Sequence, residues 1–286
     1  MQITEHIHAK RMYFKAVTPA GVMKRNVFVY LITGDHAPCL IDAGVASSVD
    51  DVLDFIADAG AGGKSVSEIL ITHAHVDHIG GLAELKCRLG CPAAASEKSA
   101  PWIEDIDIQF RQRPVPQFYD FVKRSAVIER RLSDGDEIDL GGHTLVVYEA
   151  PGHEKGQLAF YSKEDGVLLS ADSIPVLGEM PVYEDLSAEI NTLRRLDSIE
   201  NVNTLLASWD DPCEGAENVH RILKNAMDYV RLIHTLTQEG LTNFGADNVV
   251  EVARYVHNAL DLPASTFNLL FTNTIQAHIK EHDLEI

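Results

Sequence analysis

The sequence contains one short run in which four side chains can bind a metal ion: His73, His75, Asp77 and His78. The run follows the apolar residues 69–71, which predict a short buried strand. Because side chains two residues apart in an extended chain point the same way, His73 and His75 can reach one ion together. Asp77 and His78 can reach a second ion after the chain bends. Imidazole and carboxylate ligands suit zinc, iron or manganese.

Three further apolar segments, each predicted to be a strand, also end beside side chains that can bind a metal. Any one of these side chains alone would be typical of a capped turn or a solvated loop. Their shared position at strand ends instead predicts that they converge on one site. The residues are His153 after residues 144–148, Asp172 after residues 166–170, and Asp210 and Asp211 after residues 204–207.

Four motifs in this order resemble the metallo-β-lactamase-fold superfamily of metallo-hydrolases. Together they span roughly residues 25–210. The resemblance implies a four-layer αββα sandwich of the α+β class. The motifs are Leu-Ile-Asp-Ala-Gly at 40–44, Thr-His-Ala-His-Val-Asp-His-Ile-Gly-Gly at 72–81, Pro-Gly-His at 151–153 and Ser-Ala-Asp at 170–172.

The same resemblance implies a binuclear centre with two divalent metal ions. Zinc is the expected metal, and iron and manganese are alternatives. The implied ligands are His73, His75 and His153 on the first ion, Asp77 and His78 on the second, and Asp172 between the two.

Asp42, in the first motif, is implied to be a carboxylate that orients a ligand imidazole without touching the metal. Such a carboxylate fixes which ring nitrogen of the histidine carries the proton. The residues alone also allow Asp42 to be a turn residue before Gly44.

The chain departs from the family pattern after its last predicted strand, where a histidine usually completes the second site. Here residues 207–212 read Ala-Ser-Trp-Asp-Asp-Pro. Asp210 is the expected replacement, since it aligns more closely with the lost histidine than Asp211 does. Weak binding of the second metal, binding of one metal only, and a turn without any metal role are the alternatives.

The 286 residues are expected to form a metal-binding domain at 1–212 and a helical annex at 213–286. Residues 98–131 carry prolines, aromatic residues and basic residues without a clear period, and are interpreted as a partly helical lid. The layout resembles glyoxalase II, whose helical region helps to hold a thioester. Helices are expected at 47–59, at 187–199 with Ser187 as N-cap, and in the annex at 216–238, 247–259 and 265–280.

The composition indicates an enzyme of the cytoplasm. The first residues lack a signal peptide, no apolar run is long enough to span a membrane, and the four cysteines lack Cys-x-x-Cys spacing. The formal net charge of −19 argues against binding to nucleic acid. The expected partner is a small-molecule substrate, and the annex could instead mediate a homodimer.

The implied activity is metal-dependent hydrolysis by an activated hydroxide, because a bound metal lowers the pKa of water from about 15.7 to about 7. Asp77 is the expected catalytic residue, which orients this nucleophile and manages its proton. A small thioester, ester or lactone fits best, since no free acid is evident for a poorer leaving group. The alternatives are a mononuclear iron oxygenase of the persulfide dioxygenase type and a non-catalytic metal-binding protein with an incomplete second site.

Overall fold

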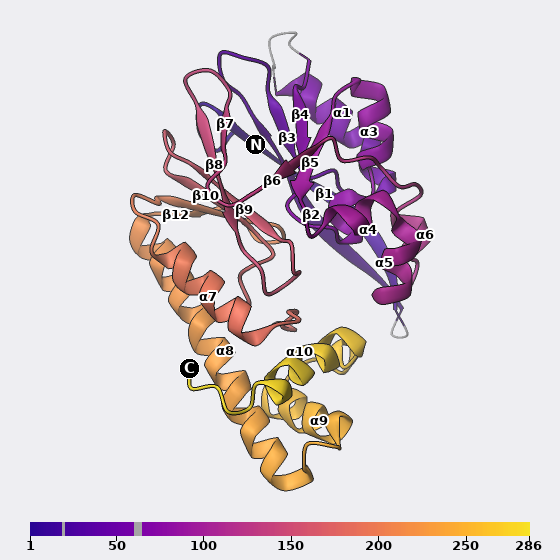
Figure 1. Cartoon of the computed structure of the whole chain (residues 1–286), viewed down its shortest axis with the longest axis vertical. Helices are drawn as coiled ribbons and strands as arrows, with labels where there is room; N and C mark the ends of the chain where they lie inside the picture. The colour runs from indigo at the N-terminus through magenta and orange to yellow at the C-terminus, as the bar shows by residue number, and fades with distance from the viewer. Residues whose placement is uncertain (19–20, 60–64) are drawn as a thin grey trace. The chain divides into compact units, whose positions relative to one another are not determined.

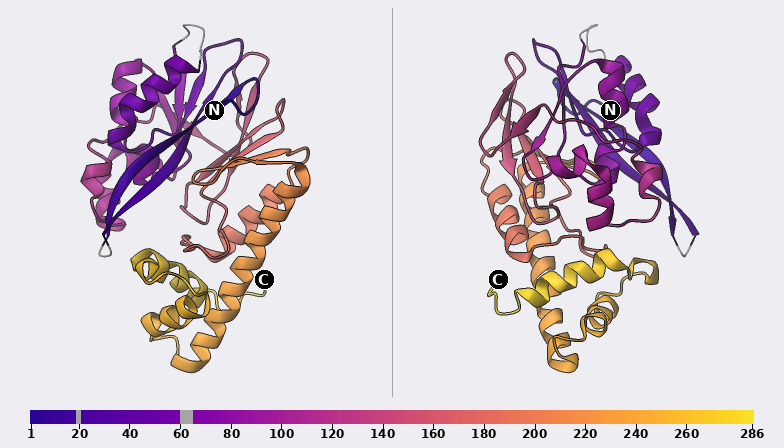
Figure 2. Two further views of the ribbon diagram at one scale, coloured as in Figure 1. Left: turned by 180° about the vertical axis from the view of Figure 1, so that it is seen from behind. Right: turned by 45° about the vertical axis from the view of Figure 1, so that its right-hand side comes forward.

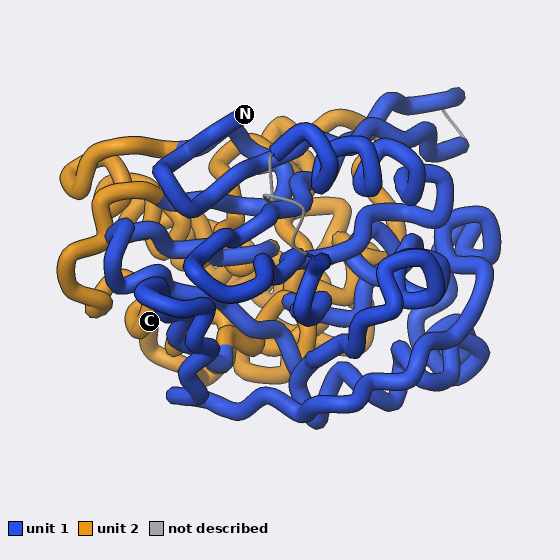
Figure 3. Tube along the Cα trace, turned by 90° about the horizontal axis from the view of Figure 1, so that it is seen from above, with its two compact units in different colours: residues 1–149, 156–171, 205–212 blue, residues 150–155, 172–204, 213–286 orange. Residues whose placement is uncertain are grey.

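The described residues of the chain form two compact units (Figure 3). The computed structural model describes residues 1–18, 21–59 and 65–286. The units alternate along the chain, and the expected boundary between residues 212 and 213 stays a prediction. Unit 1 comprises residues 1–149, 156–171 and 205–212, and unit 2 comprises residues 150–155, 172–204 and 213–286.

The first sheet of unit 1 has six strands that follow one another in chain order (Figure 1). The first two strands form a long antiparallel hairpin, the third is antiparallel to the second, and the remaining neighbours are parallel. Parallel neighbours need long crossovers, which the helices of unit 1 supply. The strands are β1 (Ile7–Thr18), β2 (Gly21–Ile32), β3 (Cys39–Ile41), β4 (Glu68–Leu70), β5 (Ala93–Ser96) and β6 (Arg130–Leu132).

The helices of unit 1 lie in the crossovers between β3 and β6. The expected helix at 47–59 is present, and the interpretation of residues 98–131 as partly helical agrees with three short helices there. The closing role expected of this segment stays a prediction. The helices are η1 (Ala46–Ser48), α1 (Val49–Asp58), α2 (Val76–Ile79), α3 (Leu82–Leu89), α4 (Ala100–Glu104), α5 (Ile106–Gln112) and α6 (Phe118–Phe121).

Unit 1 contributes five strands to the second six-stranded sheet, in the order β11-β10-β9-β8-β7. The pairs from β7 to β10 are antiparallel, and the turns at residues 133–136 and 163–166 carry the Asp-Gly chemistry that the sequence indicated. The strands are β7 (Glu137–Asp139), β8 (Thr144–Glu149), β9 (Leu158–Ser162), β10 (Val167–Ala171) and β11 (Thr204–Ala207).

The two faces of the first sheet bury different sets of side chains, because successive residues of a strand point to opposite faces. Val29 and Leu31 of β2 pack in the cluster that contains α1, α3 and the 98–131 segment. Phe28 and Tyr30, their immediate neighbours, pack in a second cluster with side chains of β8, β9 and β10. Unit 1 is therefore a helix layer on a sheet that packs face to face on another sheet.

Unit 2 is built around one long helix, α8, shown in orange in Figure 2. The helices α9 and α10 pack against it around Tyr229, Val256 and Phe271. Among the described helices, none combines the length and the apolar character that crossing a lipid bilayer requires. The elements are α7 (Leu186–Asp197), β12 (Cys213–Glu214), α8 (Ala216–Phe244), α9 (Val249–Ala259), η2 (Ala264–Thr266) and α10 (Leu269–Lys280).

Two helix starts in unit 2 differ from the sequence-based expectation. Ser187 is not the N-cap of α7, because Asp185 takes the extended cap conformation and its carboxylate accepts from the backbone N–H of Ala188. Ser187 lies inside the helix and donates its hydroxyl to Glu281. Asn268 caps α10 in the same way and delays its start to Leu269.

A buried polar chain joins the helices of unit 2. The hydroxyl of Tyr183 and Nε2 of His278 are hydrogen-bonded at 2.7 Å, and Nδ1 of His278 lies 3.1 Å from Nδ1 of His234. Burial, and secondarily the neighbouring His234, lowers the pKa of His278 to about 3. His278 is therefore neutral in the folded protein at mildly acidic pH. In the unfolded chain its imidazole binds a proton at the same pH.

We predict that replacing His278 by glutamine flattens the loss of stability below neutral pH. In the wild type, His278 binds a proton below about pH 6.5 in the unfolded chain but not in the folded chain. The free energy of unfolding therefore falls as the pH drops below that value. The slope from this one group approaches about 1.4 kcal/mol per pH unit. Urea unfolding at pH 7 and pH 5 measures it, and equal slopes for H278Q and the wild type would contradict the prediction.

Candidate metal centre

The loop between β4 and α2 brings His73 and His75 together in unit 1. Both side chains are buried, and Nε2 of His73 lies 3.0 Å from Nδ1 of His75. Their rings meet edge to face at 4.5 Å between centroids. The spacing of the two residues in sequence predicts this convergence, and two buried imidazole nitrogens side by side are a suitable pair of ligands for one ion.

Asp42, which directly follows β3, contacts a backbone N–H, a hydroxyl and an imidazole of this loop and of α2. Its carboxylate accepts from the backbone N–H of Thr72 at 2.9 Å and from the Thr72 hydroxyl. It also lies 2.8 Å from Nδ1 of His78. This contact directs Nε2 of His78 away from the carboxylate, which is the geometry that the expected role of Asp42 requires.

Two glycines allow α2 to approach the end of β3 so closely. A Cβ on Gly80 would lie 2.2 Å from the carbonyl oxygen of Phe121, and one on Gly81 would lie 2.4 Å from that of Ala43. Backbone hydrogen bonds cross the same contact, from Ala43 N–H to the His78 carbonyl at 2.8 Å. Any side chain at these positions would push α2 and its metal-capable residues away.

Asp77 lies on α2 next to His78, and its side chain is largely buried. One carboxylate oxygen of Asp77 is 3.9 Å from Nε2 of His78. This places an imidazole nitrogen and a carboxylate where the sequence predicted the second pair of ligands. Their binding of a metal stays a prediction.

Unit 2 contains the other pair, His153 and Asp172. Nε2 of His153 lies 3.2 Å from a carboxylate oxygen of Asp172, and both side chains are buried. Nδ1 of His153 donates to the carbonyl oxygen of Val182 at 2.6 Å, so Nε2 is the nitrogen that could bind a metal. Each residue is tethered to unit 1, since His153 follows β8 by four residues and Asp172 follows β10 directly.

Three residues that contact these loops were not among the predicted site residues. Thr72 links Asp42 to His73, whose Nδ1 lies 3.0 Å from the Thr72 hydroxyl. Gln109 of α5 donates to the carbonyl oxygen of Ala74, so the 98–131 segment contacts the histidine loop. Glu189 of α7 packs against Gly152, and burial raises its pKa well above the usual range.

Asp210 lies at an exposed position in the loop after β11. None of the metal-capable groups found among the described residues includes it. Its neighbour Asp211 is exposed and pairs with Arg11. The expected replacement of the missing histidine by Asp210 stays a prediction.

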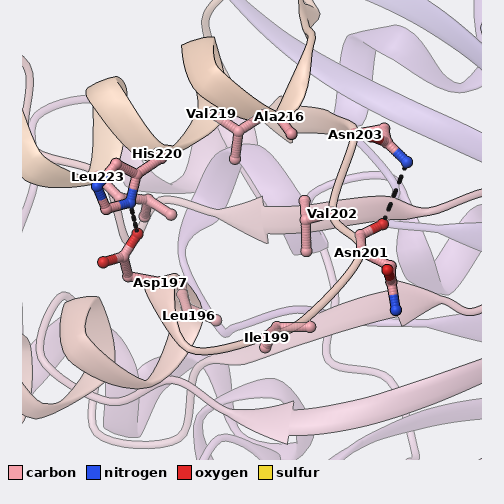
Figure 4. Close-up of a pocket in the computed structure, with 10 residues that line it drawn as sticks. All are labelled: Leu196, Asp197, Ile199, Asn201, Val202, Asn203, Ala216, Val219, His220 and Leu223. Atoms are coloured by element: carbon pink, nitrogen blue, oxygen red, sulfur yellow. Dashed lines mark hydrogen bonds and ion pairs between the residues drawn. The ribbon is translucent and has the colours of Figure 1, made fainter.

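A cavity of about 340 Å³ lies elsewhere in unit 2, between α7 and α8 (Figure 4). Its wall contains an ion pair between Nδ1 of His220 and Asp197 at 2.7 Å. None of the residues that the sequence singled out as ligands lines it. The cavity is therefore distinct from the histidine loop.

The sequence profile of the metallo-β-lactamase superfamily matches residues 22–209. This region includes both pairs of buried ligand candidates. The chain belongs to the metallo-β-lactamase superfamily. This membership confirms the prediction that the chain is a hydrolase with the metallo-β-lactamase fold.

Solved structures of this superfamily share the fold. A metallo-β-lactamase family protein from Thermus thermophilus is similar with a TM-score of 0.72 and 19% identity, over 96% of this chain and 94% of that protein. A subclass B3 metallo-β-lactamase of Bradyrhizobium japonicum has a TM-score of 0.53 and 20% identity, over 71% of this chain and 84% of that protein. The expected α+β sandwich with C-terminal helices is confirmed.

Several relatives are named hydroxyacylglutathione hydrolase. The protein from Methylococcus capsulatus is 29% identical over 175 residues, which is 60% of this chain and 57% of that relative. The protein from Bdellovibrio bacteriovorus is 24% identical over 264 residues, which is 90% of this chain and 89% of that relative. The chain thus spans little more than half the length of the first relative and most of the second.

We predict that replacing Asp42 by asparagine weakens metal binding by about 10- to 100-fold, as removing a partner that orients a ligand histidine commonly does. Asp42 has a φ of 63°, a conformation that asparagine tolerates, so the backbone should be kept. Equilibrium dialysis against zinc measures the affinity. Asp50→Asn, on the exposed surface of α1, is the control, and equal affinities for D42N and D50N would contradict the prediction.

A second prediction concerns Asp210, in the loop after β11, where the sequence departs from the family pattern. Asp210→Ala should lose one equivalent of metal and keep the first, because a carboxylate can replace imidazole as a ligand. Asp211→Ala, which removes only the pair with Arg11, should lose much less. Metal analysis gives the stoichiometry, and an unchanged value for the Asp210 variant would show that residues 207–212 form only a turn.

Proposed function

We propose that this protein hydrolyses a small carboxylic thioester at a metal centre. In this proposal His73, His75, His153 and Asp172 bind the first metal ion, and Asp77, His78 and Asp210 complete a second site with Asp172 as the bridge. Zinc is the proposed metal. The donor set of the first four residues is of a kind that can hold a metal ion.

The observation that carries the thioester is the alignment with the Bdellovibrio hydroxyacylglutathione hydrolase. It extends over 264 residues, so it cannot fit within residues 1–212 and must include part of the helical annex. The extension of this alignment into the annex favours a glutathione thioester as the substrate.

The donor atoms suit a transition metal rather than a hard oxygen-binding ion. Three of the four proposed first-site ligands are histidines, and histidine with one carboxylate is a familiar zinc set. The separations within the pairs, 3.0 Å for His73–His75 and 3.2 Å for His153–Asp172, compare with about 3.3 Å between ligands of a tetrahedral zinc ion with bonds of about 2.0 Å. The residues present therefore fit the metal.

When bound, the metal would activate a water molecule and polarise the carbonyl of the substrate. The protein's own groups have the remaining tasks. Asp77 is proposed to hold the nucleophilic water and to accept its proton. Asp42 and the Val182 carbonyl fix the proton positions of His78 and His153. A thiolate, whose conjugate acid has a pKa of about 8.5, departs without help from a general acid.

We propose the cytoplasm as the compartment and a small molecule as the only class of partner besides a second copy of the chain. Support for the cytoplasm comes from the cysteines, which are all free. The net charge of −19 disfavours nucleic acid, whose phosphates it repels. Homodimer formation through the annex stays a prediction.

We predict that an S-acyl glutathione thioester is hydrolysed with a kcat/KM at least about 100-fold above that of a lactone or a β-lactam of similar size. His75→Ala should lower this value by at least about 100-fold, since the metal supplies the main part of the chemistry. His220→Ala, in the separate cavity, is the control. Metal analysis of protein purified without added metals accompanies the assay.

Two results would contradict the proposed function. A preference for the β-lactam would assign a different hydrolytic substrate. One iron per chain together with oxygen consumption on a persulfide would assign the dioxygenase reaction instead.

A further inference from the structure

A second group of metal-capable side chains lies in unit 1, at the starting ends of β8 and β10. It consists of His6, just before β1, His143, just before β8, and Asp165, in the turn between β9 and β10. One ligand atom from each of the three lies within 4.8 Å of the others. The proposed catalytic ligands His153 and Asp172 follow the opposite ends of the same two strands.

The distances suit a single small ion. Nδ1 of His6 lies 3.2 Å from one oxygen of Asp165, and Nδ1 of His143 lies 3.9 Å from the other. The carboxylate of Glu164 is also 3.9 Å from Nδ1 of His143. These values bracket the separation of about 3.3 Å between ligands of a tetrahedral zinc ion with bonds of about 2.0 Å.

His143 is the buried member of the group. Its side chain is fully buried, and Nε2 lies 3.2 Å from the hydroxyl of Ser162. Within the described part of the chain, its Nδ1 has no hydrogen-bond partner. A buried ring nitrogen without a hydrogen-bond partner lowers the stability of the fold unless a metal ion or another group binds it. Burial also lowers the pKa of His143, which favours the neutral imidazole that ligates metals.

The protein holds these side chains in place before any ion arrives. The hydroxyl of Thr4 donates to Asp165 at 2.7 Å. The backbone N–H of Asp165 donates to Ser162, the residue that also contacts His143. Supporting contacts of this kind orient ligands in metal sites.

The group is also open to solvent on one side. The side chain of His6 is 30% exposed and that of Glu164 is 36% exposed. An ion can therefore enter, and either Glu164 or a water molecule can take the fourth position.

We propose that His6, His143 and Asp165 form a second metal site, which binds a divalent transition-metal ion such as zinc. The role is structural. The ion ties the segment before β1, in the first sheet, to the turns that precede β8 and β10 in the second. The six residues of β8 span about 20 Å at about 3.3 Å per residue, so the site lies too far along the strand to take part in the chemistry at His153.

The alternative for the same residues is an ion pair between His6 and Asp165, without a metal. Both arrangements use the 3.2 Å contact between these residues. They differ in His143, whose Nδ1 a metal would bind and an ion pair would leave unused. They also differ in the response of the protein to added zinc.

The test counts zinc bound by the full chain in equilibrium dialysis and follows thermal unfolding with and without zinc. His6→Gln and Asp165→Asn should each bind one equivalent fewer than the wild type, or bind it at least about tenfold more weakly. The part of the zinc-dependent rise in Tm that comes from this site should disappear. Thioester hydrolysis should stay unchanged in both variants.

His220→Gln is the matched control, since His220 also pairs with a single aspartate, Asp197, at 2.7 Å (Figure 4). It should bind as much zinc as the wild type. Should Asp165→Asn fail to fold, the more exposed His6→Gln still decides the outcome. Equal zinc binding by H6Q and the wild type would overturn the proposed site and leave an ion pair only. If the wild type does not hydrolyse the thioester, that result counts against the proposed function and not against this site.

Discussion

The carboxylate of Asp42 is the interaction on which the histidine loop depends. It accepts hydrogen bonds from the backbone and hydroxyl of Thr72 and contacts Nδ1 of His78 at 2.8 Å, all out of water. Burying a carboxylate is costly unless its oxygens accept hydrogen bonds. The three groups that contact Asp42 are therefore fixed in position together with it. One side chain thereby fixes the end of β3, the end of β4 and the first turn of α2 relative to one another.

The second sheet carries metal-capable side chains at both ends of the same strands. β8 runs from His143 to the loop of His153, and β10 runs from Asp165 to Asp172. Strand cores are fixed by ladder hydrogen bonds and by packing against the first sheet. The loops at either end are free of that constraint, so they can carry polar side chains without breaking the core. Opposite ends of one rigid strand can thus carry two separate groups of metal-capable side chains.

Burial shifts the pKa values of two polar side chains of unit 2 toward their neutral forms. Burial raises the pKa of Glu189, which packs against Gly152, well above its usual range, and it lowers the pKa of His278, between Tyr183 and His234, to about 3. Neutral forms avoid the cost of a buried charge without a partner. The net charge of −19 creates a field that favours the approach of divalent cations.

The sequence by itself determined the fold family, the strands that end in metal-capable residues and the meeting of His73 with His75. These follow from local rules, because strand periodicity and a two-residue spacing act within a few positions of the chain. It also predicted a carboxylate partner for a ligand histidine, and Asp42 indeed contacts His78. It misplaced the cap of α7, since Ser187 and Asp185 carry equivalent signals and only the backbone geometry separates them.

Only the tertiary structure decided which distant residues meet. His6, His143 and Asp165 stand alone in the sequence, more than 20 positions from one another, and no spacing rule joins them. Gln109 reaches the histidine loop, and Glu189 reaches Gly152, through the packing of helices whose patterns predict only burial. Local sequence sets which face of an element is apolar, whereas side-chain contacts between elements depend on how those faces pack together in three dimensions.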